Sequence, residues 1–340
     1  MLQRTFRSII ATFLLSGLYA STSLAETAPQ SPADEVSFAS DREFDSASII
    51  YAVAQERGFL AEAGVRITPA KGAPSITPGD ASRPARVNSD LVFLGRHRLY
   101  RLALEHPGAL KVFNINTQDG KKWNEAILAR RDLKIDSLEK VPRGAKFALV
   151  GNRGASETLV DAVLKGAQIP RDRFIFTNPS DLALRSYEGA KAVPLAGIDL
   201  LYAREPYLSV ILASGEWAPL MDAPWYAQKV LDPWLLTMSA FDSQFLSSRP
   251  GVAKRLFTAL ERARVFVNEH PEESSAIFSA YLKEKTGVTV KVRDVNYLRY
   301  DQVSPEILQK QSDWYFNNGL LGSKIDTREL LFNEHLLDRQ

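Results

Sequence analysis

Short apolar runs alternate along the first part of the chain with segments whose apolar residues recur at helical spacing. The runs with the length and composition of strands are 35–39, 65–69 and 90–94. Residues 46–57 place four apolar side chains on one helical face, and Gly58 follows as a C-cap. Residues 96–105 repeat the helical spacing. This alternation predicts an α/β architecture with mostly parallel strands.

The same alternation continues through the middle of the chain, whereas the last third is helical. Strands are predicted at 110–116, 124–130, 146–150, 173–176 and 197–203. Helices are predicted at 155–165, 180–189 and 206–214. After a return strand at 234–239, helices are predicted at 250–268, 271–283, 292–300, 305–317 and from 327. The predicted fold class is therefore α/β with an α-helical C-terminal part.

The N-terminal segment has the features of a cleavable signal peptide. Arg4 and Arg7 precede the apolar run 9–20, and the small-residue pattern Ser23-Leu24-Ala25 follows it. A run of about 12 residues is too short for the roughly 20 that a membrane-spanning helix needs. We therefore expect residues 1–25 to be a signal peptide, 26–34 to be a flexible leader and the protein to be periplasmic, with no stable membrane insertion.

Composition narrows the class of protein further. The chain has 42 basic and 40 acidic residues, and removal of the signal peptide takes away two arginines and no acid. A net charge near zero argues against nucleic-acid or membrane-surface partners. The chain has no cysteine, so neither disulfides nor lipoprotein anchoring is open to it. A mature chain of about 315 residues is longer than a single hydrophobic core usually supports, so we expect two lobes.

Five stretches, in order, resemble the substrate-binding proteins of nitrate, sulfonate, taurine and thiamine-pyrimidine ABC importers. They are "SASIIYAVAQERGFLAEAGVRI" (46–67), "DLVFLG" (90–95), "DSLEKVPRGAKFALVGNRG" (136–154), "GIDLLYAREPYL" (197–208) and "FLSSRPGVAKRLFTALERARVFVNEHPEESSAIF" (245–278). One stretch departs from the family, because Pro78, Gly79 and Pro84 interrupt the helix that is expected between 75 and 87.

The resemblance implies a type II periplasmic binding fold with two lobes, each a mostly parallel sheet flanked by helices. Lobe one would comprise 35–130 and 240–340, and lobe two 131–239, with hinge strands at both ends. The solute would lie in the cleft, beyond the carboxyl ends of the strands, where helix N-termini point. The implied partners are a small-molecule ligand and the permease subunits of an ABC transporter, and the protein would be a monomer without a cofactor.

Two turns between a strand and a helix are candidate ligand sites. The first is "GNRG" (151–154), where Asn152, Arg153, Gly154 and, in the helix, Ser156 would donate hydrogen bonds to an anion. It lacks the Lys-Ser/Thr of a phosphate-binding P-loop. The alternative is that Gly154 is a plain N-cap and that Glu157 occupies the positive helix end.

The second turn contains Arg96 and His97, two basic residues at a helix N-terminus. The helix dipole disfavours cations there, and a bound anion would reverse the local sign. The alternative is that both side chains point into solvent and pair with Glu105 or another acid. His97 has no spacing partner for a metal site, so we expect none.

Other candidate ligand contacts follow from the resemblance and from the aromatic residues. Glu205 and Tyr207 belong to the "AREPY" segment that closes a strand beside the cleft in the family, with helix capping as the alternative for the carboxylate. Ser46 could contact the ligand or simply cap the first helix. Trp234 is a candidate aromatic cover, because tryptophan offers a large apolar face with one donor.

These residues predict a solute-binding protein rather than an enzyme. The predicted solute is a small organic anion, with a sulfonate-like molecule as the first candidate. A neutral heteroaromatic such as a pyrimidine, a ligand-binding sensor, and an enzyme on the same fold are the alternatives. No Ser-His-Asp order and no catalytic carboxylate pair is apparent in the sequence.

Overall fold

Two mixed β-sheets carry the fold. The computed structural model describes residues 33–40, 48–72, 74–77, 86–122, 124–149, 155–177, 197–287, 289–292 and 295–337. The strands of the first sheet are β1 (Asp34–Ser40), β2 (Val65–Pro69), β5 (Leu91–Gly95), β6 (Leu110–Gln118), β12 (Trp234–Asp242) and β13 (Asn296–Tyr297). Those of the second sheet are β7 (Glu125–Arg130), β8 (Ala145–Leu149), β9 (Phe174–Thr177), β10 (Leu200–Arg204) and β11 (Trp217–Met221). The short strands β3 (Ile76–Thr77) and β4 (Arg86–Val87) pair with each other.

Ten α-helices are described alongside these strands. They are α1 (Ile49–Glu56), α2 (Phe59–Glu62), α3 (Arg96–Glu105), α4 (Ala155–Gly166), α5 (Tyr207–Ala213), α6 (Ala223–Lys229), α7 (Ser243–Ser248), α8 (Pro250–Glu269), α9 (Pro271–Thr286) and α10 (Pro305–Asn317). Helix α10 begins with proline after Ser304, whose side chain accepts a hydrogen bond from the Ile307 N–H. Within the described residues, no helix is long and apolar enough to cross a membrane.

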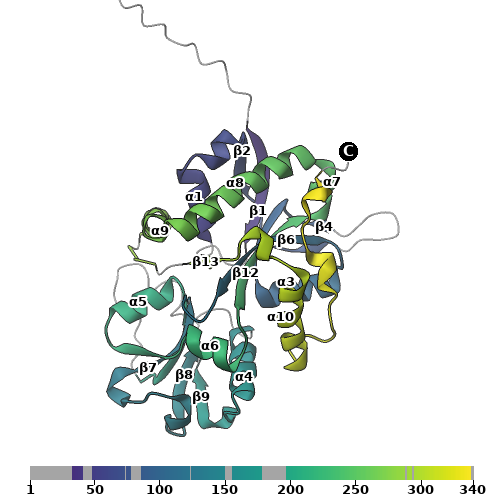
Figure 1. Cartoon of the computed structure of the whole chain (residues 1–340). Helices are drawn as coiled ribbons and strands as arrows, with labels where there is room; N and C mark the ends of the chain where they lie inside the picture. The colour runs from purple at the N-terminus through teal and green to yellow at the C-terminus, as the bar shows by residue number, and fades with distance from the viewer. Residues whose placement is uncertain are drawn as a thin grey trace, which may run out of the picture. The chain divides into compact units, whose positions relative to one another are not determined.

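Helices cover both faces of the first sheet, as the alternating side chains of β5 show. Its order is β13-β6-β12-β5-β1-β2. Leu91 and Phe93 belong to a core cluster with apolar residues of α1 and α8, whereas Val92 and Leu94 belong to the cluster that contains residues of α3 and α10. These four helices are labelled in Figure 1. Successive side chains of a strand point to opposite faces, so a strand that is buried on both sides reads as a continuous apolar run.

The second sheet follows the same rule in the order β11-β7-β10-β8-β9. Ile127 and Ala129 of β7 pack in the cluster that includes α4, whereas Ala126 and Leu128 pack with α5 residues. The cluster on the α4 side also contains residues of the first sheet, such as Met238. The apolar core is therefore continuous where the two sheets meet.

The chain passes between the sheets twice, through neighbouring strands. It leaves the first sheet at the end of β6 and enters the second at β7, and it returns from β11 and α6 to β12. Strands β6 and β12 pair antiparallel from Trp234↔Gln118 to Asp242↔Leu110. A register shift between Leu235 and Thr237 leaves Leu236 as the extra residue on β12.

The predicted α/β class is confirmed, and one feature of the sheets differs from the prediction. The sheets are mixed rather than mostly parallel, because the crossing strands run against their neighbours: β12 is antiparallel to both β5 and β6, and β7 is antiparallel to both β10 and β11. The helix predicted at 292–300 is wrong, since Asn296 and Tyr297 form β13 and pair with β6. The helix predicted at 180–189 lies outside the described residues.

The boundary between the predicted lobes differs from the sheet boundary at both crossings. Residues 125–130, assigned to lobe one from the sequence, form β7 in the second sheet, and residues 234–239, assigned to lobe two, form part of β12 in the first sheet. Strand pairing decides this, because β7 finds its hydrogen-bond partners in β10 and β11. The division into two lobes remains a prediction.

We expect Phe113→Ala to destabilise the protein strongly. The Phe113 ring stacks on Phe241 with 4.2 Å between the ring centroids, and it also meets the edges of Phe257 and Phe332. Truncating a buried phenylalanine costs about 3–5 kcal/mol of unfolding free energy. Urea denaturation measures the loss. The control is Ile175→Ala at a side chain that is 53% exposed, which should change the unfolding free energy by less than about 0.5 kcal/mol.

Candidate functional site

A buried ion pair lies where the two sheets meet. Arg96 is the first residue of α3, directly after β5, and Glu125 is the first residue of β7. The two residues are 6% and 0% exposed. Arg96 Nη2 donates to both carboxylate oxygens of Glu125, at 2.9 and 3.1 Å. Burial favours a lower pKa for the Arg96 guanidinium, but the Glu125 carboxylate and neighbouring tyrosines raise that pKa above its ordinary value. Arg96 is therefore charged.

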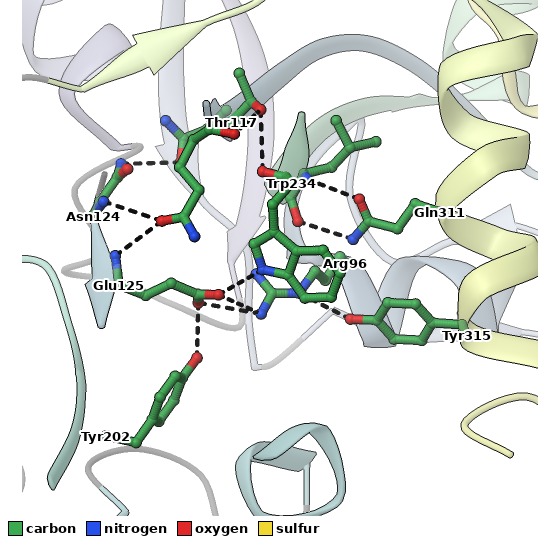
Figure 2. Close-up of polar contacts among 11 residues, drawn as sticks. Arg96, Thr117, Asn124, Glu125, Tyr202, Trp234, Gln311 and Tyr315 are labelled. Atoms are coloured by element: carbon green, nitrogen blue, oxygen red, sulfur yellow. Dashed lines mark hydrogen bonds and ion pairs between the residues drawn. The ribbon is translucent and has the colours of Figure 1, made fainter. Parts of the chain in front are cut away.

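The Glu125 carboxylate accepts hydrogen bonds from both sheets (Figure 2). Besides Arg96, it receives the Tyr202 hydroxyl of β10 at 2.7 Å and the Trp234 indole N–H of β12 at 2.6 Å. Burial, followed by the Glu125 charge, raises the pKa of Tyr202 well above its ordinary value, so the hydroxyl keeps its proton and donates. A buried carboxylate with several donors is stable in a site where an unpaired one would not be.

The C-terminal helix α10 holds the other side of this cluster. Arg96 Nε donates to the Tyr315 hydroxyl at 2.9 Å, and the guanidinium carbon lies 4.7 Å from the Trp234 ring centroid. One turn earlier in α10, the Gln311 amide accepts from the Leu235 N–H at 2.8 Å and donates to the Leu235 carbonyl at 2.9 Å. Helix α10 thereby fixes both the arginine and the first residues of β12.

Buried amide side chains line the crossing between β6 and β7. Gln118 Oε1 accepts from the backbone N–H groups of Asn124 and Glu125, at 3.4 and 3.3 Å. Asn124 Nδ2 donates to Asn116 Oδ1 at 3.4 Å, and Asn116 Nδ2 donates to the Asn296 carbonyl at 2.9 Å. These bonds connect the end of one sheet with the start of the other through side chains.

A small pocket opens beside the ion pair and the amides. Its lining consists of Arg96, Asn116, Asn124, Glu125, Arg204, Glu205, Leu236 and Thr237. The remaining space has a volume of about 10 Å³, enough for about one water molecule. Two arginines and two glutamates give the lining a formal charge of zero. The pocket can therefore offer polar contacts without a net formal charge.

Two polar atoms of this lining have no hydrogen-bond partner among the described residues. They are Asn124 Oδ1 and Thr237 Oγ1, in side chains of residues that are 3% and 2% exposed. Asn114 Oδ1 and Gln118 Nε2, which belong to β6 and do not line the pocket, are also unpartnered. Because a buried polar group without a partner costs free energy, such atoms mark a place where a bound molecule can supply the missing bond.

The structure places the two basic residues predicted at the start of α3 in different surroundings. Arg96 lines the pocket and pairs with buried Glu125, while Glu105 pairs with Arg101 at 3.6 Å. His97 is half-buried outside the pocket lining, and its ring stacks on Tyr315 with centroids 5.9 Å apart.

Of the other candidate residues that the structure describes, Glu205 lines the pocket, whereas Trp234, Tyr207 and Ser156 do not. The Glu205 carboxylate accepts from the N–H and hydroxyl of Ser209, at 3.3 and 2.8 Å, in the first turn of α5. Trp234 is fully buried in the core, and Tyr207 packs against the cluster on the α5 side of the second sheet. Ser156 is buried in α4.

Four predicted contacts, Ser46, Asn152, Arg153 and Gly154, lie outside the described residues. In α4, the Glu157 side chain forms an ion pair with Arg171, which also pairs with Asp161 at 2.7 Å. The carboxylate that was the alternative occupant of the α4 N-terminus therefore has a partner side chain.

Sequence reasoning missed the polar residues on the crossing strands. The sequence pattern predicts strands at or beside four such residues and assigns no function to them: Asn116, Asn124, Glu125 and Thr237. The available signal was their position, since the strand Leu110–Gln118 is buried along most of its length and still carries four polar residues near its end. Polar side chains are uncommon in a strand that is buried on both faces, because each needs a partner.

Three solved structures resemble this chain over most of its length. The periplasmic aliphatic sulfonate-binding protein of Escherichia coli shares 14% sequence identity, with 88% of this chain and 92% of that chain covered and a TM-score of 0.59. The desulfurization enzyme DszB shares 15%, with 90% and 98% covered and a TM-score of 0.60. A Candida albicans gene product with the generic periplasmic binding protein fold shares 15%, with 88% and 96% covered and a TM-score of 0.56.

The likeness establishes the architecture of the chain. No protein-family model and no curated protein matches the sequence. The chain has the periplasmic binding protein fold, which confirms the fold expected from the sequence resemblance. Binding proteins and an enzyme share this fold, so the function has to be argued from the site.

We expect Glu125→Gln to cost about 3–5 kcal/mol of unfolding free energy, because it leaves the buried Arg96 charge without compensation. The double variant Arg96→Met/Glu125→Gln should recover much of that loss, since it removes the uncompensated charge as well. Urea denaturation of the wild type, the single variants Glu125→Gln and Arg96→Met, and the double variant measures the coupling. A single variant with the wild-type midpoint would show that the pair does not support the fold.

Acid should weaken the fold partly through His97. Burial, together with the charges of Arg101 and Arg96, lowers the pKa of this imidazole in the folded state. An unfolded histidine titrates near pH 6.5. Below that pH the unfolded chain takes up a proton that the folded chain resists, so stability is lost as pH falls from about 6.5 toward the lower folded pKa. Between about pH 7.5 and pH 5, the wild type should lose more stability in urea titrations than His97→Gln. Equal losses would contradict this.

Proposed function

We propose that this protein is an extracytoplasmic solute-binding protein that delivers a small organic solute to an ABC permease. The observation that carries the proposal is the pair of unpartnered polar atoms, Asn124 Oδ1 and Thr237 Oγ1, in a pocket at the junction of the two sheets. The periplasmic binding protein fold supports it, and so does the signal-peptide pattern with Arg4, Arg7 and the apolar run behind them. Periplasmic location and a monomeric state belong to the same proposal.

The proposed mechanism is binding coupled to movement of the sheets. The space among the lining residues holds about one water molecule, so an organic solute fits only when the two sides move apart. The pocket takes lining residues from both sheets, with Thr237 on the first and Arg204 on the second. A solute that contacts both sides binds more tightly when they are close together, and this difference in affinity shifts the equilibrium toward the closed form. Release to the permease then requires that the two sides separate again.

The state of the charged groups favours binding over catalysis. The Glu125 carboxylate is occupied by Arg96, Tyr202 and Trp234, so it is not available as a general base. Glu205 is engaged with Ser209 at the start of α5. The chain also has no cysteine to act as a thiol nucleophile. Enzymes on this fold, such as DszB, make a catalytic role the rival proposal.

Two classes of solute are candidates. A sulfonate-like organic anion is the first, and the fold of the Escherichia coli aliphatic sulfonate-binding protein supports it. A neutral heteroaromatic such as a pyrimidine is the second, and the formally neutral lining of the pocket favours it. The two classes differ in whether the solute must bring a negative charge.

A thermal-shift screen of the mature protein tests the proposal. The panel contains sulfonates, carboxylates, nitrate and pyrimidines, and we expect one class to raise the melting temperature. A ligand at 100 times its dissociation constant adds about 2.7 kcal/mol to the free energy of unfolding. Every compound that binds is then incubated with the protein and examined for conversion. Turnover of a bound compound would support the rival enzyme role, and a panel without any shift would contradict solute binding of these classes.

A further inference from the structure

The orientation of the Asn124 amide is set by a backbone carbonyl through a chain of two side chains. The Asn296 carbonyl can only accept, so Asn116 must turn its Nδ2 toward it, at 2.9 Å. Asn116 then presents Oδ1 to Asn124, which must in turn donate through Nδ2, at 3.4 Å. The atom of Asn124 that remains without a partner is Oδ1. It is therefore an acceptor.

The backbone of Asn124 is held as well. Its N–H donates to Gln118 Oε1 at 3.4 Å, and its carbonyl accepts from the Glu205 N–H at 2.8 Å. The residue is 3% exposed and lines the pocket. Turning the Asn124 amide would break its bond to Asn116, so a solute at this position meets an acceptor.

An acceptor at this position discriminates between chemical classes of solute. Sulfonate and nitrate oxygens only accept hydrogen bonds, so they cannot pair with Asn124 Oδ1 and would bury it without a partner. An N–H group supplies the missing donor. The neighbouring Thr237 hydroxyl, on β12 directly after the extra residue Leu236, can donate to an acceptor atom of the same solute.

We propose that Asn124 is a specificity-determining residue whose Oδ1 accepts a hydrogen bond from an N–H group of the solute. The inference rests on the proposed solute-binding function and narrows it. The solute class is an amine or amide that carries an acceptor or anionic group beside the nitrogen. A simple alkanesulfonate does not belong to this class, whereas an aminosulfonate or a lactam-type heterocycle does.

Isosteric pairs of probes test this preference directly. In the first pair, 2-aminoethanesulfonate is compared with 1-propanesulfonate, in which a methyl group replaces the ammonium group. In the second, benzamide is compared with acetophenone, in which a methyl group replaces the amide nitrogen and no charge changes. Isothermal titration calorimetry on the mature protein should show about tenfold tighter binding of the N–H member, the worth of one hydrogen bond.

Variants separate recognition from a structural effect. Asn124→Ala should reduce the preference within each pair to about onefold, whereas a merely structural change would weaken both members equally. Asn114→Ala is the matched control, because Asn114 is also a buried asparagine with an unpartnered Oδ1 but does not line the pocket. It should leave the preference unchanged. Circular dichroism checks that each variant is folded.

The outcomes keep the two proposals apart. Equal or tighter binding of the methyl members would overturn the inference about Asn124 and leave the solute-binding function standing. A preference that survives Asn124→Ala would also overturn it. If none of these four probes and no compound of the thermal-shift panel binds, both proposals fail.

Discussion

The Glu125 carboxylate is the interaction on which the junction of the two sheets depends. It lies at the first residue of β7, directly after the chain has crossed from the first sheet. Arg96 and Trp234 donate to it from the side of the first sheet, and Tyr202 donates from the second sheet. Removing two charges from water is costly, and the cost is offset here because each carboxylate oxygen has at least two donors. The same arrangement makes Glu125 hard to replace alone, since its loss deprives the buried Tyr202 hydroxyl and the Trp234 indole N–H of this acceptor.

Local sequence pattern predicted the elements well where one signal dominated. Strand β2, helix α3 and helix α10 have the predicted bounds, because their periodicity and end signals are strong and agree. Pairing between distant segments could not be read in this way. Asn296 and Tyr297 belong to a segment with a helical pattern, yet they pair with Thr117 and Asn116, far away in the chain. The membership of β7 in the second sheet is likewise decided by partners that the local pattern does not identify.

The candidate site illustrates the same limit from the side of chemistry. Arg96 could be singled out because a cation at a helix N-terminus conflicts with the dipole. The conflict indicated a nearby negative charge, and the structure shows that Glu125, 29 residues away, supplies it. The sequence left a bound anion and an acidic side chain such as Glu105 open as the partner, since sequence alone does not show which acid folds back onto the helix. Asn124 and Thr237 gave no comparable conflict, because asparagine is an ordinary turn residue at the start of a predicted strand and threonine is common within strands.

The different roles of charged and neutral groups within the junction support the proposed binding role over a catalytic one. The charged groups of Arg96 and Glu125 form an ion pair, and Glu125 also accepts from an aromatic donor. They therefore serve a structural role and are not free to transfer protons. The buried atoms of the lining that lack a partner among the described residues are a neutral amide oxygen and a hydroxyl. Hydrogen bonds between neutral groups contribute less free energy each than charge-assisted ones. In the proposed role, a site built from them would hold a solute selectively and still release it, as delivery to a second protein requires.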